Sequence, residues 1–123
     1  MSRTVLVIDD EPDVVLMIRL ALELRGYRVV EAGTGTDGIE AILRENPDAV
    51  LLDLRLPDID GWDVIEDLRA RGRFDEQPVI IISAHASPGT SERAVKLGCT
   101  AYVRKPFHPD ALVAVVDRAL ATA

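Results

Sequence analysis

Residues 5–11 read Val-Leu-Val-Ile-Asp-Asp-Glu, an apolar run that stops abruptly at three carboxylates. Short, uninterrupted apolar runs with β-branched residues are typical of strands buried on both faces. The next residues place Val14, Ile18 and Leu22 at helical spacing, which predicts an amphipathic helix. A buried strand followed by such a helix is the repeating unit of a parallel α/β sheet.

The same alternation continues to the end of the sequence. Four further apolar runs predict strands at 27–30, 49–52, 79–82 and 101–103, with segments of helical period between them. Right-handed crossovers then predict one α/β domain over residues 1–123, a doubly wound parallel sheet with helices on both faces. We expect the purely apolar runs at Val5, Val50 and Val79 to be central, and the more polar run at 27–30 to be an edge.

Composition narrows the classes of partner. A net charge of −7 argues against direct binding to nucleic acid, because that affinity depends on lysine and arginine. No stretch approaches the roughly 20 apolar residues of a membrane span, and the N-terminus lacks a signal sequence, so we expect a cytoplasmic protein. Cys99 is the single cysteine, which we expect to serve as a small packing residue.

Reactive side chains gather where the predicted strands end. Parallel sheets bind ligands beyond the carboxyl ends of their strands, and the residues found there are Asp9, Asp10, Asp53, Ser83 and Lys105. Carboxylates brought together repel one another, and a hard cation such as Mg²⁺ relieves that repulsion. A carboxylate can also attack phosphorus, with a lysine and a hydroxyl binding the phosphoryl oxygens. The set therefore indicates phosphoryl transfer to one of these carboxylates.

Each of these residues also has an ordinary structural interpretation. Asp10, Glu11 and Asp13 could favour a helix N-terminus through the macrodipole. Asp53 or Ser83 alone could be a cap, and Lys105 alone could be a surface lysine. Their joint position at strand ends favours a shared site.

Four ordered blocks resemble the receiver domain of bacterial two-component response regulators, and the resemblance runs from Val5 to Leu120. The blocks are Val7-Ile8-Asp9-Asp10-Glu11-Pro12, Leu51-Leu52-Asp53-Leu54-Arg55-Leu56-Pro57-Asp58-Ile59-Asp60-Gly61, Ile82-Ser83-Ala84 and Tyr102-Val103-Arg104-Lys105-Pro106-Phe107.

This resemblance implies a flavodoxin-like fold with five helices and strand order 2-1-3-4-5, an order that is general knowledge of the fold. It implies that Asp53 is the phosphoacceptor and that Mg²⁺ is held by Asp9, Asp10, Asp53 and the main-chain carbonyl of Arg55. It also implies that Lys105 pairs with the phosphoryl oxygens and that the Lys105-Pro106 bond is cis. Such a domain signals and is not a turnover enzyme.

The resemblance further implies a switch in which Ser83 bonds the phosphoryl group and Tyr102 turns inward. The surface of the fourth helix, last strand and last helix would then control an output domain or a target protein, or would form a homodimer. The phosphodonor would be a sensor histidine kinase or phosphotransfer protein, and Arg55 and His85 occupy positions that tune dephosphorylation. In the last helix, we expect Val113 and Ala114 to face partly outward and contribute to a docking surface.

Three other functions are compatible with parts of the pattern. A haloacid dehalogenase-type phosphatase also uses an aspartate nucleophile, but it places that residue after the first strand within Asp-x-Asp, where this chain has Asp9-Asp10-Glu11. A flavodoxin-type FMN carrier needs a phosphate-binding loop at the same place, where these acids would repel phosphate. A receiver-like protein that signals without phosphorylation remains a further alternative.

Overall fold

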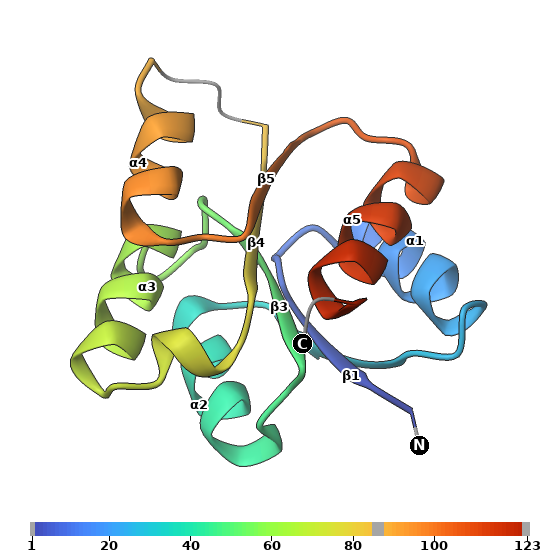
Figure 1. Ribbon diagram of the computed structural model, residues 1–123, viewed down its shortest axis with the longest axis horizontal. Coiled ribbons are helices and arrows are strands. Elements are labelled where there is room, and N and C mark those ends of the chain that lie inside the picture. The colour runs from blue at the N-terminus through green and yellow to red at the C-terminus, as the bar shows by residue number, and fades with distance from the viewer. Residues whose placement is uncertain (1, 85–87, 122–123) are drawn as a thin grey trace.

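Five strands and five α-helices alternate along the chain in the computed structural model, which describes residues 2–84 and 88–121 (Figure 1). The elements are β1 (Thr4–Ile8), α1 (Pro12–Glu23), β2 (Arg28–Ala32), α2 (Gly35–Glu45), β3 (Ala49–Asp53), α3 (Gly61–Ala70), the 3₁₀ helix η1 (Phe74–Glu76), β4 (Val79–Ser83), α4 (Thr90–Leu97), β5 (Ala101–Arg104) and α5 (Pro109–Ala121). Within the described residues, no helix is long and apolar enough to cross a membrane.

The sheet is parallel throughout and has the order β2-β1-β3-β4-β5. The expected strand order is thereby confirmed, as are the central positions of the three purely apolar runs. Their side chains are buried on both faces of the sheet, which explains why these runs show no polar alternation. The more polar β2 lies at one edge, also as expected.

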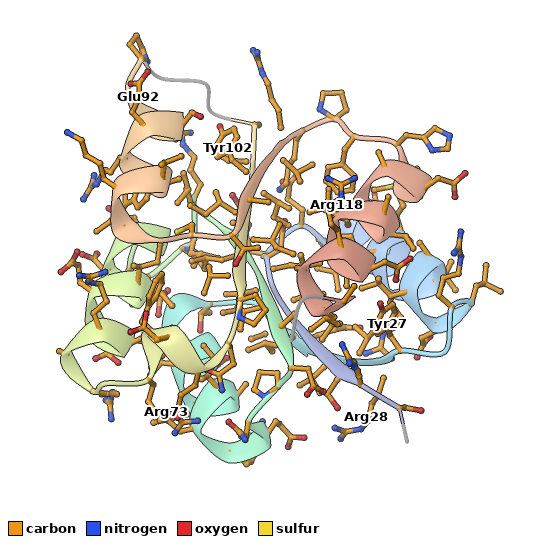
Figure 2. The ribbon with its side chains drawn as sticks, in the orientation of Figure 1. Tyr27, Arg28, Arg73, Glu92, Tyr102 and Arg118 are labelled. Atoms are coloured by element: carbon orange, nitrogen blue, oxygen red, sulfur yellow. The ribbon has the colours of Figure 1, made fainter. Side chains whose placement is uncertain are left out.

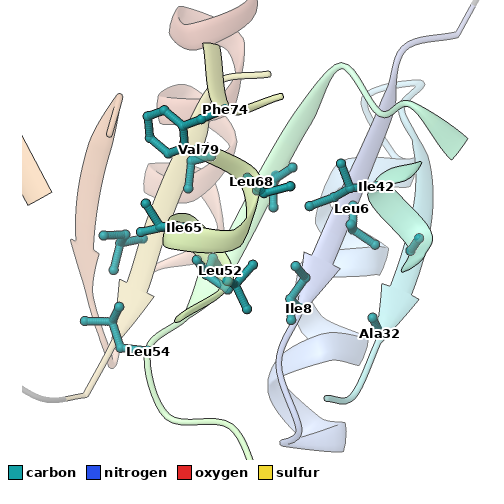
Figure 3. Close-up of a cluster of buried hydrophobic side chains, with 14 of the residues drawn as sticks. Leu6, Ile8, Ala32, Ile42, Leu52, Leu54, Ile65, Leu68, Phe74 and Val79 are labelled. Atoms are coloured by element: carbon teal, nitrogen blue, oxygen red, sulfur yellow. The ribbon is translucent and has the colours of Figure 1, made fainter. Parts of the chain in front are cut away.

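Alternate strand residues supply two separate cores. On one face, Leu6, Ile8 and Leu52 pack against α2 and α3, whose Ile42, Ile65 and Leu68 point toward them (Figure 3). On the other face, side chains such as Val5 and Val7 pack against α1 and α5. The two helical layers lie on opposite sides of the sheet in Figure 1. This arrangement leaves the carboxyl ends of the strands uncovered by helices.

The packing of α5 corrects one expectation. Val113 was expected to face partly outward, but only 2% of it is exposed and it belongs to the core shared with α1. The prediction was wrong because α5 contacts α1 as well as the sheet, so its buried arc is wider than a single stripe. Ala114 is exposed as expected. Val113 therefore gives no support to a docking surface on α5.

Candidate functional site

The acidic cluster arises from the pairing of β1 with β3. Ile8 is aligned with Leu52 in that pairing, so the next residues, Asp9 and Asp53, emerge side by side. Both are buried, with 2% and 4% exposure, whereas Asp10 is exposed. These three residues each offer a carboxylate oxygen within 4.8 Å of the others. Three oxygens this close form a set that a hard divalent cation can bridge.

Lys105 enters this cluster from the segment after β5. Its Nζ lies 2.7 Å from Asp9 Oδ2 and donates hydrogen bonds to Asp53 Oδ2 at 3.1 Å and to Glu11 Oε1 at 2.7 Å. The Lys105-Pro106 peptide bond is cis, as the resemblance implied. Lys105 thus supplies one buried positive charge to three carboxylates.

Glu11 is a site residue that the sequence interpretation missed. It was counted among the carboxylates after the first strand but was given no role in the site, yet its side chain contacts Lys105 and its amide donates to Asp9 Oδ1 at 2.8 Å. The one available signal was its place directly after Asp9-Asp10. That signal is weak, because an acid at this point also suits the start of α1.

Electrostatic strain in the cluster is shown by its pKa values. Burial raises the pKa of Asp9 and the nearby Asp53 charge adds to this, although Lys105 and the Glu11 amide act in the opposite direction. Burial would lower the pKa of Lys105, but its hydrogen bonds to the surrounding carboxylates outweigh burial and raise it. Asp9 Oδ2 is paired with Lys105 by charge at 2.7 Å, but among the described residues no donor meets it in normal hydrogen-bond geometry. The carboxylate oxygens of the cluster therefore carry negative charge and lone pairs that a cation could bind.

The segment after β3 holds Asp53 in place. The Arg55 amide donates to Asp53 Oδ1 at 3.1 Å, and the Gly61 amide donates to the Leu54 carbonyl at 2.8 Å. A Cβ atom at Gly61 would lie 2.7 Å from both the Asp53 carbonyl oxygen and the Leu54 Cα. Only glycine allows this close approach, which brings the start of α3 against the backbone at the end of β3.

Asp58 fastens the same segment to α2. Its carboxylate accepts from the Gly35 amide at 2.8 Å, from the Thr36 amide at 3.0 Å and from the Thr36 hydroxyl at 2.6 Å. The Thr36 hydrogen bonds are the main reason that the pKa of Asp58 lies well below its ordinary value. An acid at a helix N-terminus also satisfies amides that have no partner within the helix. The loop between β3 and α3 is thereby held at both ends.

The remaining predicted residues are placed around one cleft. A hollow of about 300 Å³ is lined by residues that include Asp10, Asp53, Arg55, Ser83 and Lys105. Ser83 is fully buried at the end of β4. The structure therefore brings together, in a single cleft, residues that the sequence placed at four different strand ends.

Two predicted residues lie apart from this cleft or outside the described chain. Tyr102 on β5 is half-buried and packs against the core on the α2–α3 side of the sheet, near α4 (Figure 2). Half-burial is intermediate between the two positions that the resemblance implied. His85 lies outside the described residues, so its expected role stays a prediction.

The profile of the response regulator receiver domain matches residues 5–117. The chain belongs to this family. Proteins of the family are the receiver domains of two-component response regulators, which take part in signal transduction. The resemblance seen in the sequence is thereby confirmed, and so is the α/β fold.

Curated relatives of this receiver domain include regulators of transcription. It is 42% identical to the transcriptional regulatory protein KdpE of Mycobacterium tuberculosis over 110 residues, which cover 89% of this chain and 47% of that protein. It is 34% identical to the regulatory protein AtoC of Escherichia coli over 116 residues, which cover 94% of this chain and 25% of that protein. The chain thus spans half or less of the length of these relatives.

Solved structures share the whole fold of this receiver domain. The signal receiver domain of a putative LuxO repressor protein from Vibrio parahaemolyticus has a TM-score of 0.92 at 27% identity, covering 99% of this chain and 92% of the other. A putative response regulator from Chloroflexus aurantiacus has a TM-score of 0.89 at 30% identity, covering 98% and 99%.

Proposed function

We propose that this receiver domain is a switch that accepts a phosphoryl group on Asp53. The observation that carries the proposal is the setting of the Asp53 carboxylate at the carboxyl edge of the sheet. One oxygen accepts from the Arg55 amide, the other accepts from Lys105, and both lie beside a cleft that is open to solvent. A nucleophile held at a fixed orientation, next to donors for the incoming oxygens, is what phosphoryl transfer requires.

The acidic cluster fits Mg²⁺ in the type, number and spacing of its oxygens. In this proposal Asp9, Asp10, Asp53 and the main-chain carbonyl of Arg55 hold the ion. When bound, Mg²⁺ supplies positive charge that neutralises the carboxylates and the phosphoryl oxygens. The pKa of Asp9 is raised mainly by burial and further by the Asp53 charge, and a bound cation would favour the ionised form of this carboxylate.

The proposed transfer forms a bond between an Asp53 carboxylate oxygen and phosphorus, and breaks the bond between phosphorus and the donor. The donor leaves with the bonding electron pair, as a histidine imidazole or as acetate. Lys105 and the Ser83 hydroxyl bind the equatorial oxygens, which carry most of the charge. Water later hydrolyses the acyl phosphate at a rate that we propose Arg55 and His85 influence.

We propose that phosphorylation changes the surface formed by α4, β5 and α5. Support comes from the weak attachment of α4, in which Ala94 is the buried residue and Val95 is largely exposed. Arg93 also stacks on the ring of Trp62 at 4.3 Å, a contact at the protein surface that a shift of α4 would break at small cost. Engagement of Ser83 by the phosphoryl group and an inward turn of Tyr102 would bias that shift.

We propose that a histidine kinase or phosphotransfer protein docks on α1. Leu16 and Leu20 on this helix and Leu24 at its C-cap are each more than half exposed, and their four-residue spacing forms one apolar stripe. Helix α1 begins directly after Asp10 and Glu11, which line the cleft, so a protein bound to this helix lies close to the cleft. Isolated exposed leucines are ordinary, but a continuous stripe beside a reactive site suits a partner.

Docking on α1 can be tested separately from the phosphoryl transfer itself, because acetyl phosphate needs no docking surface. Leu20→Arg is expected to slow transfer from the cognate kinase by at least about tenfold while leaving phosphorylation by acetyl phosphate unchanged. Leu43→Arg, at an exposed leucine of α2 on the other side of the sheet, is the control and should leave both reactions unchanged. Equal loss in the two variants would rule out a specific role for α1.

The first test of the function is the intact mass of the protein after incubation with acetyl phosphate and Mg²⁺. We expect one added phosphoryl group that hydroxylamine removes, and none with Asp53→Asn or with EDTA. Absence of the adduct in the wild-type protein, with a cognate kinase as well as with acetyl phosphate, would refute the proposed function. Retention of the adduct in Asp53→Asn would refute the assignment of the acceptor.

We further propose that residues 1–123 act as one receiver domain in the cytoplasm, where kinases obtain ATP. Its output is proposed to be a further domain or a separate target protein, or a second copy bound through the surface of α4, β5 and α5. Relatives named as transcriptional regulators support the first of these for the whole protein.

A further inference from the structure

The three carboxylates around Lys105 differ in their freedom to move. Asp9 has a fully buried side chain, and Asp53 is the proposed acceptor itself. Glu11 has a side chain that is 56% exposed and contacts the ammonium at 2.7 Å from the solvent side. Glu11 can therefore leave Lys105 and enter water with little desolvation cost, whereas the two buried aspartates cannot.

An ammonium group has three N–H donors, and three carboxylates surround that of Lys105. A phosphoryl group on Asp53 needs at least one of these donors. The phosphoryl oxygens therefore compete with the resting contacts of Lys105, and Glu11 is the contact that can be given up most easily. The charge of Glu11 also lies on the lining of the cleft through which an anionic phosphodonor enters.

We propose that Glu11 is a positioning residue that holds the Lys105 ammonium in the resting state and so restrains phosphorylation of Asp53. The proposal rests on the function proposed above and deepens it. Glu11 competes with the incoming phosphoryl group for the same donor. The restraint ends when the phosphoryl oxygens replace the Glu11 carboxylate on Lys105.

The experiment measures the rate of phosphorylation by acetyl phosphate at saturating Mg²⁺. The saturating concentration is first determined for each variant by a Mg²⁺ titration that is monitored through the fluorescence of Trp62. Saturation removes the separate effect that a lost carboxylate has on metal affinity. We expect Glu11→Gln to be phosphorylated about three- to tenfold faster than the wild type, because the ion pair with Lys105 becomes a weaker hydrogen bond to an uncharged amide. Glu11→Asp keeps the charge but is too short to maintain the contact, and should be faster by a smaller factor.

Two controls separate this contact from a general change in charge. Asp13→Asn removes the same charge two residues further along, at an exposed position in the first turn of α1, and should change the rate by less than about twofold. In a Lys105→Met background, Glu11→Gln should no longer accelerate the reaction. The proposal is overturned if Glu11→Gln slows the reaction, if Asp13→Asn matches it, or if the acceleration persists without Lys105.

A second readout needs no phosphorylation. Urea unfolding of Glu11→Gln, Lys105→Met and the double variant, without Mg²⁺, measures the coupling of these two side chains. We expect the two substitutions to be non-additive by about threefold or more in the folding equilibrium constant; strict additivity would overturn the positioning role. If the wild-type protein is not phosphorylated although coupling is present, the proposed function has failed and the contact stands. If phosphorylation occurs without coupling, the failure belongs to the inference about Glu11.

Discussion

Replacement of Gly61 by alanine tests how tightly the backbone around Asp53 is packed. The added methyl group would lie 2.7 Å from the Asp53 carbonyl oxygen and the Leu54 Cα, and 3.0 Å from the Leu54 Cδ2. Two of these three atoms belong to the backbone, so a side-chain rotation cannot relieve the overlap. Either α3 or the end of β3 has to move by several tenths of an ångström.

The net effect on stability combines two terms of opposite sign. Overpacking of this kind costs about 1–3 kcal/mol. Alanine is the better helix former by up to about 1 kcal/mol, although less at the first position of a helix, where Gly61 lies. We therefore expect Gly61→Ala to lower the free energy of unfolding by about 1–2 kcal/mol. With a urea dependence of about 2 kcal/mol per molar, the midpoint falls by about 0.5–1 M.

Urea unfolding followed by the single tryptophan, Trp62, measures this change directly. Gly33→Ala is the matched control, because a Cβ atom there would have no neighbour within 4 Å, and its effect should stay within about 0.5 kcal/mol. Displacement of the Asp53 backbone should also slow phosphorylation by acetyl phosphate by about tenfold or more. A Gly61→Ala protein with wild-type stability and wild-type rate would refute the assigned close packing.

Three further perturbations have defined outcomes. Lys105→Met is expected to lower the free energy of unfolding by about 1–3 kcal/mol at pH 7, because three carboxylates lose their cation. Mg²⁺ should reduce this difference in stability from the wild type, and a difference that Mg²⁺ leaves unchanged would contradict the prediction. Asp58 has a lowered pKa in the folded state, so its stabilising contribution is present above about pH 4 and lost as the pH falls below that value; the difference in melting temperature between wild type and Asp58→Asn should shrink in acid rather than stay constant. Burial raises the pKa of Cys99 from 9.0 to about 11, which lowers its thiolate fraction at pH 8 by roughly a hundredfold. Alkylation by iodoacetamide should therefore be slow until urea unfolds the protein, and equal alkylation rates in the folded and unfolded states would count against this.

Much of the site could be predicted because its residues directly follow the strands. Asp9 and Asp53 end apolar runs that are recognisable by composition, and in a parallel sheet all such ends lie at one edge. Their closeness then needs only the adjacency of β1 and β3. The motif resemblance supplied that strand order, whereas periodicity alone indicated only which strands are central.

Contacts across the chain were not predictable in the same way. Glu11 and Lys105 are separated by 94 positions, and nothing in either local sequence indicates that the two side chains meet. The attachment of Asp58 to the start of α2 and the burial of Val113 beneath α1 are of the same kind. Each depends on how two elements are oriented against each other, and many packings are compatible with the same apolar stripes.

By itself the sequence determined the order of strands and helices, the three central strands and the set of reactive side chains, because hydrophobic period and strand-end position are local properties of the chain. The tertiary structure decided which carboxylates share Lys105, how closely Gly61 approaches the Asp53 backbone and which face of each helix is covered. These features depend on how segments far apart in sequence are positioned relative to one another, to within a few tenths of an ångström. Such distances are set by packing of the whole domain.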